Sequence, residues 1–539
     1  MMKRRILVII SDVAILMISI LISMFVPENI KIIPIISSIT LILLRHLWRI
    51  IKLKITFYDI DEDLVYLVSH MYAVSTGKPP RRRLFELNNI AGGYGLYDSI
   101  LRRIAKLAVE WGYGFNKAVR IVIKEVRNKV FRDFLLRLGE ILNIGEDPER
   151  FLDVERRAFL TEFQAHYGRV VEATKLLLGV YTSGVSSSIF LVITFLIFSL
   201  LFSTSPDTIF MVYIGIIVTL SILLYVIYRI LPRDRTTHTL HIYPPERKWY
   251  RMLLLSGLVM SIFFGGYVYI NTLSPSMAMS LGAIPLLIPG LYARKIEKKI
   301  REIESFFPIF IRSFGLTYST VPHVPTALTS VLRSDYGPLT QYLKRLLARL
   351  NLGINPKTAW IRFIGETWSE SIRRNVNILY DAIDAGGDLA EVGTILSETT
   401  FRILDIRKQR IQVSKAFEST IYIIHSIFSA VLSFILTLMN IFYTLIVTVQ
   451  ASAENLPSIL PFQPLPVDLI NTITPFFLII LALLNAFAIK VAQGGMYETM
   501  WVPLSILIFV SGVVMHAMQL VANTMFSGIF DIVHIVELG

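Results

Sequence analysis

The sequence predicts an all-α, polytopic membrane protein with about nine transmembrane helices and two cytoplasmic helical-bundle domains in a tandem parallel duplication. Three observations support this fold class. The chain has 539 residues, 54% of them hydrophobic, and its mean hydropathy of +0.60 indicates more apolar surface than a soluble protein of this length can bury. Apolar segments long enough to span a bilayer recur along the chain. Two long polar stretches between them show helical periodicity.

The transmembrane helices are predicted from segments of about 20 mostly apolar residues. They are Ile6–Val26, Ile30–Trp48, Leu176–Phe202, Thr208–Leu231, Met252–Thr272, Ser276–Tyr292, Ser419–Val449, Leu469–Lys490 and Trp501–Ser527. The sixth is short, and Pro285 and Pro289 are expected to interrupt it. A cleaved signal peptide is the alternative for the first span because Lys3, Arg4 and Arg5 precede it, but no small-residue cleavage site follows.

The positive charges predict the orientation of these spans. Lys3, Arg4 and Arg5 place the N-terminus on the cytoplasmic side. The C-terminus then lies outside, and every basic residue except Lys31 falls in or beside a cytoplasmic segment. One missed span would move a basic segment outside, so the charge pattern supports the span count. We therefore predict a multi-pass protein of the cell membrane, with its N-terminus inside and its C-terminus outside.

These spans divide the chain into domains. Transmembrane helices occupy residues 1–48, 176–231, 252–292 and 419–527, the two cytoplasmic domains 49–175 and 293–418, a cytoplasmic loop 232–251, and an external tail 528–539. Both domains are expected to be helical because their apolar residues recur every three or four positions. Leu64, Leu67 and Val68 show this spacing in the first domain, and Leu343 and Leu346 show it in the second.

The two halves of the chain resemble each other. With an offset of 241 or 242 residues, Tyr94-Gly95 corresponds to Tyr336-Gly337, Arg132 to Arg373, and Gly145 to Gly386. Each half consists of two spans, a helical domain and two more spans. An even number of spans keeps both copies in the same orientation. We therefore predict a tandem duplication to which the ninth span is an addition.

A similar turn in both domains is expected to start a long helix. The domain-turn residues are Gly145 and Asp147 in the first copy and Gly386, Gly387 and Asp388 in the second. The glycines end one helix, and each aspartate is placed to cap the next. Asp388 and Glu391 have the spacing of a capping box. Because no proline follows for some 50–60 residues, we predict helices about 80 Å long that join each domain to the membrane, with Gly184 as a candidate hinge.

The duplicated helical bundle and the Gly-Gly-Asp-Leu turn that begins at Gly386 resemble the type II secretion system F-domain family. The first copy is similar at Leu142–Gly145 and Phe151–Glu155 but has Glu146 where the second has Gly387. About nine spans with two large domains look more like the archaeal branch of the family. That branch serves archaella and archaeal adhesive pili.

The resemblance implies a non-enzymatic platform protein beneath a growing filament. Its implied partners are a cytoplasmic hexameric secretion ATPase and pilin-like or archaellin filament subunits, and it implies no cofactor. The platform would couple the ATPase to the insertion of subunits into the filament. The resemblance does not decide whether the protein forms a homodimer. It also does not decide whether the filament is an archaellum, an adhesive pilus or a secretion pseudopilus.

Motifs for catalysis are missing from the sequence. The chain has no cysteine, which excludes disulfides and thiolate chemistry. Pro79 follows Gly77-Lys78 where a Walker A motif needs serine or threonine. His238 and His241 are interpreted as two solvated histidines rather than a metal site. We therefore expect no catalytic, cofactor-binding or metal-binding residue. A secondary transporter with parallel internal repeats is the alternative function, suggested by the proline-broken sixth span.

Basic clusters in the cytoplasmic segments are the candidate functional residues. They are Arg81, Arg82 and Arg83; Arg102 and Arg103; Lys344 and Arg345; Arg373 and Arg374; and Arg407, Lys408 and Arg410. Positive-inside bias with attraction to anionic membrane lipid is one interpretation, and docking of an acidic face on the ATPase is another. Binding of nucleic acid is disfavoured because the clusters lack interleaved aromatic residues. They are the candidate ATPase-docking residues, a role that would require them to be exposed, and no nucleic-acid partner is expected.

Overall fold

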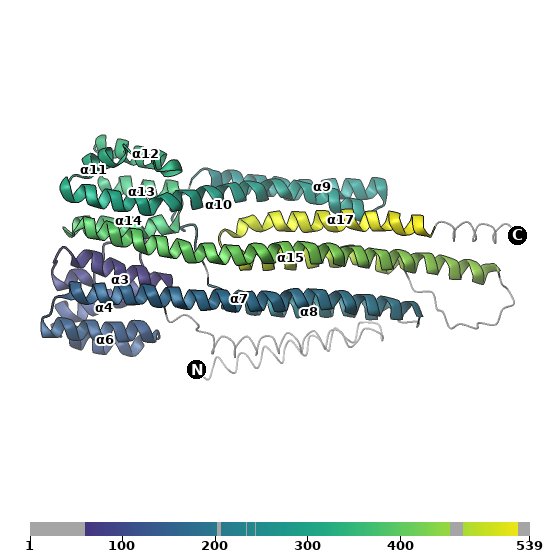
Figure 1. Ribbon diagram of the computed structural model, residues 1–539, viewed down its shortest axis with the longest axis horizontal. Helices are drawn as coiled ribbons and strands as arrows, with labels where there is room; N and C mark the ends of the chain where they lie inside the picture. Colours follow the sequence, from purple (N-terminus) through teal and green to yellow (C-terminus); the bar gives the residue numbers. More distant parts are fainter. Residues whose placement is uncertain (1–59, 202–205, 233, 243, 453–466, 527–539) are drawn as a thin grey trace.

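The computed structural model describes residues 60–201, 206–232, 234–242, 244–452 and 467–526, which form an elongated helical molecule (Figure 1). The described residues contain no strand, although Thr237 and Ser369 form a single antiparallel bridge. The predicted all-α fold class is therefore confirmed. The first two predicted spans and the external tail lie outside the described residues.

Two helical domains lie at one end of the molecule (Figure 1). The first consists of α3 (Glu62–Ser75), η2 (Arg81–Leu84), α4 (Leu96–Ala105), η3 (Lys106–Glu110), α5 (Phe115–Val122), η4 (Ile123–Glu125) and α6 (Lys129–Ile144). The second consists of the end of α10 (Pro275–Thr320), α11 (Val324–Val331), η5 (Gly337–Leu339), α12 (Thr340–Asn351), α13 (Pro356–Thr367) and α14 (Glu370–Asp384). One apolar core runs through both, from Phe131 and Phe134 to Phe310 and Trp360.

The membrane part follows the predicted spans. Seven helices among the described residues are long and apolar enough to cross a membrane. They lie in α7 (Pro148–Leu201), α8 (Pro206–Ile230), α9 (Glu246–Thr272), α10, α15 (Leu389–Ser452), α16 (Val467–Gln493) and α17 (Trp501–Met525), the last preceded by η6 (Tyr497–Met500). They coincide with the third to ninth predicted spans. The protein is therefore a multi-pass membrane protein.

Three helices extend without a break from the two helical domains into the apolar part. α7 has 54 residues and α15 has 64, so they are roughly 80 and 95 Å long at 1.5 Å per residue. α7 remains helical through Gly184, which therefore does not break the helix. These two long helices agree with the absence of internal prolines in the sequence.

The third long helix, α10, differs from the prediction. It is a single helix of 46 residues although it contains Pro285, Pro289 and Pro308. A proline removes one backbone hydrogen bond, and neighbouring helices can compensate for that loss inside a membrane. Gly257 of α9 provides the space, because a Cβ there would lie 3.2 Å from the Pro289 ring. The prediction of an interrupted sixth span was therefore wrong.

The elements of the two domains follow one another in a similar order. α4, α5, α6 and α7 have their counterparts in α12, α13, α14 and α15, and α3 has its counterpart in the end of α10. At the place of α11 the first domain has the shorter η2. Both domains place a left-handed glycine before the long helix, with φ of 91° at Gly145 and 70° at Gly386. This order is what a tandem duplication would produce.

Candidate functional site

The domain turns cap the long helices as expected, with one exception. Asp147 Oδ1 accepts from the N–H of Glu149 at 3.0 Å, and Asp388 Oδ1 accepts from the N–H of Ala390 at 2.9 Å. Only half of the predicted capping box forms, because Asp388 Oδ1 also accepts from the N–H of Glu391 at 3.3 Å but the Glu391 side chain does not bond the N–H of Asp388. The N–H of Asp388 donates to Thr76 Oγ1 at 3.0 Å, and the Glu391 carboxylate accepts from Tyr72 instead. The second turn is therefore also a contact with the first domain.

Arg374 lies at the centre of a buried charged contact between the two domains. Its side chain is 3% exposed, and its Nη2 lies 2.7 Å from Asp63 Oδ1 and its Nε 3.0 Å from Glu370 Oε1. Its Nη1 lies 3.1 Å from Glu62 Oε1, within ion-pair distance but without hydrogen-bond geometry. Arg407 reaches the other oxygen of Glu62 at 2.8 Å. We call Glu62, Asp63, Glu370, Arg374 and Arg407 the interdomain clamp.

Arg373 extends this contact to the loop before α4. Its Nη1 donates to the carbonyls of Ala91 and Gly92, each at 2.8 Å, while its Nη2 pairs with Glu370 at 2.6 Å. Burial would raise the pKa of the Glu370 carboxyl, but Arg373 and Arg374 together hold it below its usual range. The carboxylate therefore stays ionised inside the protein.

A second contact between the domains is centred on Asp381 of α14. His70 Nε2 lies 2.9 Å from its Oδ2, the N–H of Asn88 donates to the same oxygen at 2.8 Å, and Arg83 pairs with its Oδ1. Burial would raise the pKa of Asp381, but His70, Asn88 and Arg83 lower it below the ordinary value. Arg83, one of the predicted docking residues, is thus bound mainly within the protein.

Arg410 anchors α15 at the start of the apolar region. Its guanidinium donates to the carbonyls of Ala492 and Val491 at 2.9 and 2.8 Å, near the end of α16. It also pairs with Asp234 at 2.9 Å, in the segment after α8. Carbonyls at a helix C-terminus lack intrahelical donors, and a cation there also complements the helix dipole. Arg410 therefore joins three segments.

The expectation of a fully exposed basic surface is wrong for part of the predicted set. Arg373, Arg374 and Arg410 are buried, and the Arg407 side chain is only 11% exposed. The sequence did not reveal their acidic partners, which lie far away along the chain. Exposed members of the set are Arg81, Arg82, Arg102, Arg103, Lys344, Arg345 and Lys408. Four of these, Arg102, Arg103, Lys344 and Arg345, lie on the corresponding helices α4 and α12.

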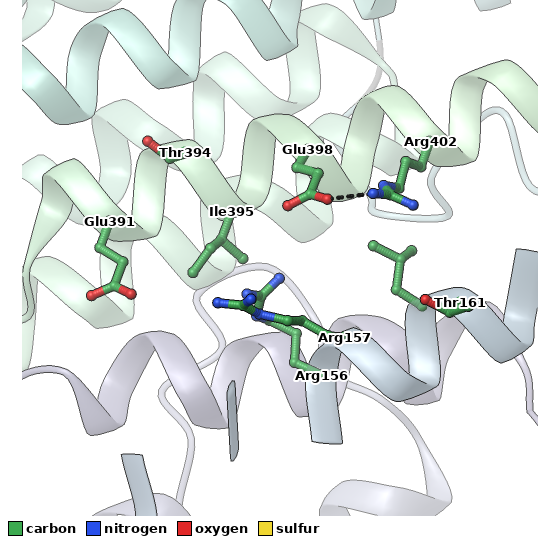
Figure 2. A pocket seen from close by; sticks show the side chains of 9 residues that line it. Arg156, Arg157, Thr161, Glu391, Thr394, Ile395, Glu398 and Arg402 are labelled. Atoms are coloured by element: carbon green, nitrogen blue, oxygen red, sulfur yellow. Dashed lines mark ion pairs between the residues drawn. The ribbon is translucent and has the colours of Figure 1, made fainter. Parts of the chain in front are cut away.

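A groove of about 610 Å³ separates α7 from α15 within the domain region. Figure 2 shows Arg156 and Arg157 of α7 directed toward α15, which contributes Glu391, Glu398 and Arg402. The ion pairs at this groove form within one helix, between Glu398 and Arg402 at 2.7 Å and between Asp153 and Arg157 at 2.7 Å. The ion pair that Figure 2 marks joins Glu398 and Arg402 of the same helix and does not cross the groove.

A chain of hydrogen bonds joins four helices in the apolar part. Tyr181 of α7 donates to Asn485 of α16 at 3.0 Å, whose Nδ2 lies 3.2 Å from His425 Nδ1 of α15. His425 Nε2 lies 2.8 Å from Ser511 Oγ of α17. All four residues are fully buried or nearly so. Buried polar groups in a membrane find partners on neighbouring helices, and here they tie α7 and α15 to α16 and α17.

The interpretation of two solvated histidines was half wrong. His241 is exposed, but His238 is 2% exposed and fixes the segment 234–242 onto α13 through the carbonyl of Ile364 at 3.0 Å. The described residues contain no group of three or more His, Cys, Asp or Glu side chains that could hold a metal ion.

Comparison with known proteins finds one family match and two named relatives. Residues 310–437, which span most of the second domain and the first part of α15, match the type II secretion system (T2SS) protein F family. The chain is 29% identical over 407 residues to flagella accessory protein J of Methanocaldococcus jannaschii, covering 72% of this chain and 71% of that protein. It is 25% identical over 440 residues to the protein of the same name from Methanococcus voltae, covering 79% and 78%. No solved structure matches.

The family match begins in α10 and ends within the apolar half of α15, so it includes the Gly386 turn and the continuous helix after it. These are the features on which the resemblance in the sequence rested. Residues 310–437 therefore match the type II secretion system protein F family, and the chain is similar over most of its length to two flagella accessory proteins J.

Proposed function

We propose that this chain is the membrane platform of an archaeal type IV pilus-like filament machine, an archaellum or an adhesive pilus. It would couple a cytoplasmic ATPase to the insertion of filament subunits. The match of residues 310–437 to the protein F family and the names of the two relatives support a filament machine. The observation that carries the coupling role is the continuity of α7 and α15 from the cytoplasmic domains into the apolar part.

The contacts suggest how force would travel. The interdomain clamp and the shared apolar core make the two domains a single body. Because α7 and α15 both begin in this body, a displacement of the domains moves both helices together. The hydrogen-bonded chain through His425 and Asn485 then ties that motion to α16 and α17. The helices of the apolar part would hold the filament subunit during insertion.

The transporter alternative loses its main support. It was suggested by a broken sixth span, whereas α10 is one continuous helix. The polar groups at His425 bridge helices, a role that needs no transported substrate.

A proline in the middle of α15 tests the coupling. Leu404 lies between the domain and the apolar part, and Leu404→Pro removes a helix hydrogen bond and clashes with the preceding turn, at a cost of about 3 kcal/mol or more. We expect the variant to insert into the membrane and to co-purify with its ATPase but to assemble few or no filaments. Filaments per cell are counted by electron microscopy in a strain lacking the native gene.

Leu404→Ala is the matched control, because it shortens the same side chain and keeps the helix. The control should assemble filaments at nearly the normal rate. Normal assembly by Leu404→Pro, with the protein present at normal levels, would show that α15 does not transmit force. A wild-type chain that supports no filament would refute the proposed function as a whole.

A further inference from the structure

Each cytoplasmic domain exposes one large apolar side chain at the same turn of the repeat. In the first domain η3 ends at Glu110 and is followed by Trp111-Gly112, and in the second α12 ends at Asn351 and is followed by Leu352-Gly353. Trp111 is 62% exposed and Leu352 is 79% exposed. The two glycines have left-handed φ angles of 69° and 72°. The two turns share the 241-residue offset that relates Gly145 to Gly386.

Both turns lie at the end of the molecule farthest from the membrane. Glu110, next to Trp111, lies 3.6 Å from Arg82. The neighbouring Arg81 donates to the carbonyl of Leu142, just before the turn that starts α7. α12 begins near the membrane, where Lys299 lies over the Tyr342 ring and pairs with Glu246 at the start of α9. The 12 residues of α12 extend roughly 18 Å away from there.

The segments on either side of both residues carry more basic than acidic residues, although Arg103 pairs with Glu125, Arg120 with Glu140 and Arg349 with Glu366. Residues 340–362 include Lys344, Arg345, Arg349, Lys357 and Arg362 and no acidic residue. Residues 102–124 include Arg102, Arg103, Lys106, Lys117, Arg120 and Lys124, with Glu110 as the only acid. Nearly all of these basic residues are exposed. The apolar helices lie at the opposite end of the molecule (Figure 1), so in the predicted orientation this charge faces the cytoplasm.

A single exposed apolar side chain is common on protein surfaces and would not by itself indicate a binding site. Here the same turn carries one in both domains, and each stands within a basic surface. In the first domain Tyr113 adds a second aromatic ring, 6.4 Å from that of Trp111. Interface energy concentrates in large, central side chains of this kind, which a charged rim surrounds.

We propose that Trp111 and Leu352 are the two anchors of one docking surface, and that its partner is an acidic, symmetric homo-oligomer. Each anchor enters an apolar pocket with an acidic rim, on a different subunit of the partner. A repeated protein that presents the same turn twice can use both only if the partner repeats its own surface. In Figure 1 α4 and α12 lie toward opposite edges of the domain end, which suits two separate subunits. The inference rests on the proposed function in taking the cytoplasmic ATPase as this oligomer.

Binding of the purified ATPase to the full-length chain in detergent tests the proposal. The variants are Trp111→Ala, Leu352→Ala and the double variant. We expect each single variant to weaken binding at least ~10-fold and the double variant to weaken it further, because two linked contacts reinforce each other by about 10²–10⁴-fold. Binding should also weaken as salt rises, since the surrounding charges are exposed.

Leu96→Ala is the matched control. Leu96 is 80% exposed and belongs to the same domain, but it lies at the other end of α4. It should bind the ATPase like the wild type, and all variants should elute as monodisperse protein. Wild-type binding by the double variant would overturn the anchor proposal while leaving the proposed function intact. Absence of any ATPase binding by the wild-type chain would instead overturn the proposed coupling function and the choice of partner together.

Discussion

Single residues of the interdomain clamp connect segments that are far apart in the sequence. Arg374 meets three carboxylates, of Glu62, Asp63 and Glu370, and its guanidinium lies over the Tyr66 ring at 5.2 Å. Burying such a group is favourable only while all its partners remain in place. If Arg374 is removed, three carboxylates lose a charge partner inside the protein, and the contact between the two domains is weakened.

Replacing Arg374 by methionine therefore tests the clamp. Arg374→Met keeps much of the side-chain volume and should destabilise the domains by about 3–5 kcal/mol, the usual effect of breaking a buried ion pair. The thermal unfolding midpoint of the detergent-solubilised protein measures the loss. Arg102→Met, at an exposed position of α4, should shift the midpoint little. Equal midpoints for the two variants would contradict a structural role for Arg374.

At the scale of elements, the segment 234–242 attaches the membrane part to the second domain. The N–H of Leu240 donates to His238 Nδ1 at 3.3 Å, and His238 Nε2 lies 3.0 Å from the carbonyl of Ile364. Since Nδ1 must accept and Nε2 must donate, only the neutral imidazole satisfies both bonds. The N–H of Glu370 also donates to the carbonyl of Thr236 at 3.0 Å.

This attachment should weaken in mild acid. Burial lowers the pKa of His238 below its ordinary 6.5, more than the bond to Ile364 raises it. A histidine whose folded pKa is lowered contributes stability above pH 6.5 and loses it as the pH falls toward the folded value. Hydrogen exchange in residues 234–242, corrected for the intrinsic pH effect, should rise over that range.

Two variants separate this effect from a general response to acid. His238→Gln cannot titrate and should remove the pH dependence, whereas His241→Gln, at an exposed position, should retain it. If the His238 variant kept the wild-type dependence, another group would have to be responsible.

At the scale of the whole molecule, the positive charges predict an orientation in the membrane that places both helical domains in the cytoplasm. The absence of cysteine makes this directly testable, because any introduced cysteine is unique. Asn271 is exposed near the end of α9 and should face outside, whereas Ser330 is exposed on α11 and should face the cytoplasm.

Labelling with a membrane-impermeant maleimide gives the measurement. Asn271→Cys should react in intact cells, and Ser330→Cys should react only after lysis. The reverse pattern would invert the whole protein and place the proposed docking surface outside the cell, where no ATPase could reach it.

The sequence by itself determined the elements that depend on local chemistry. The predicted spans from the third to the ninth coincide with helices, because about 20 apolar residues suffice to define each one. The turns at Gly145 and Gly386 and the long helices after them were predictable for the same reason. A left-handed glycine, a capping aspartate and a proline-free stretch act within a few residues of each other.

Only the tertiary structure decided which basic residues are accessible. Arg102 and Arg374 look alike in the sequence, yet one is exposed, and the other is buried against Glu62 and Asp63 more than 300 residues away in the chain. The continuity of α10 through three prolines was likewise decided by packing, since Gly257 of a neighbouring helix makes room for Pro289. Burial and close approach depend on which distant segments pack against each other. The spacing of residues within one segment does not show which segments those are.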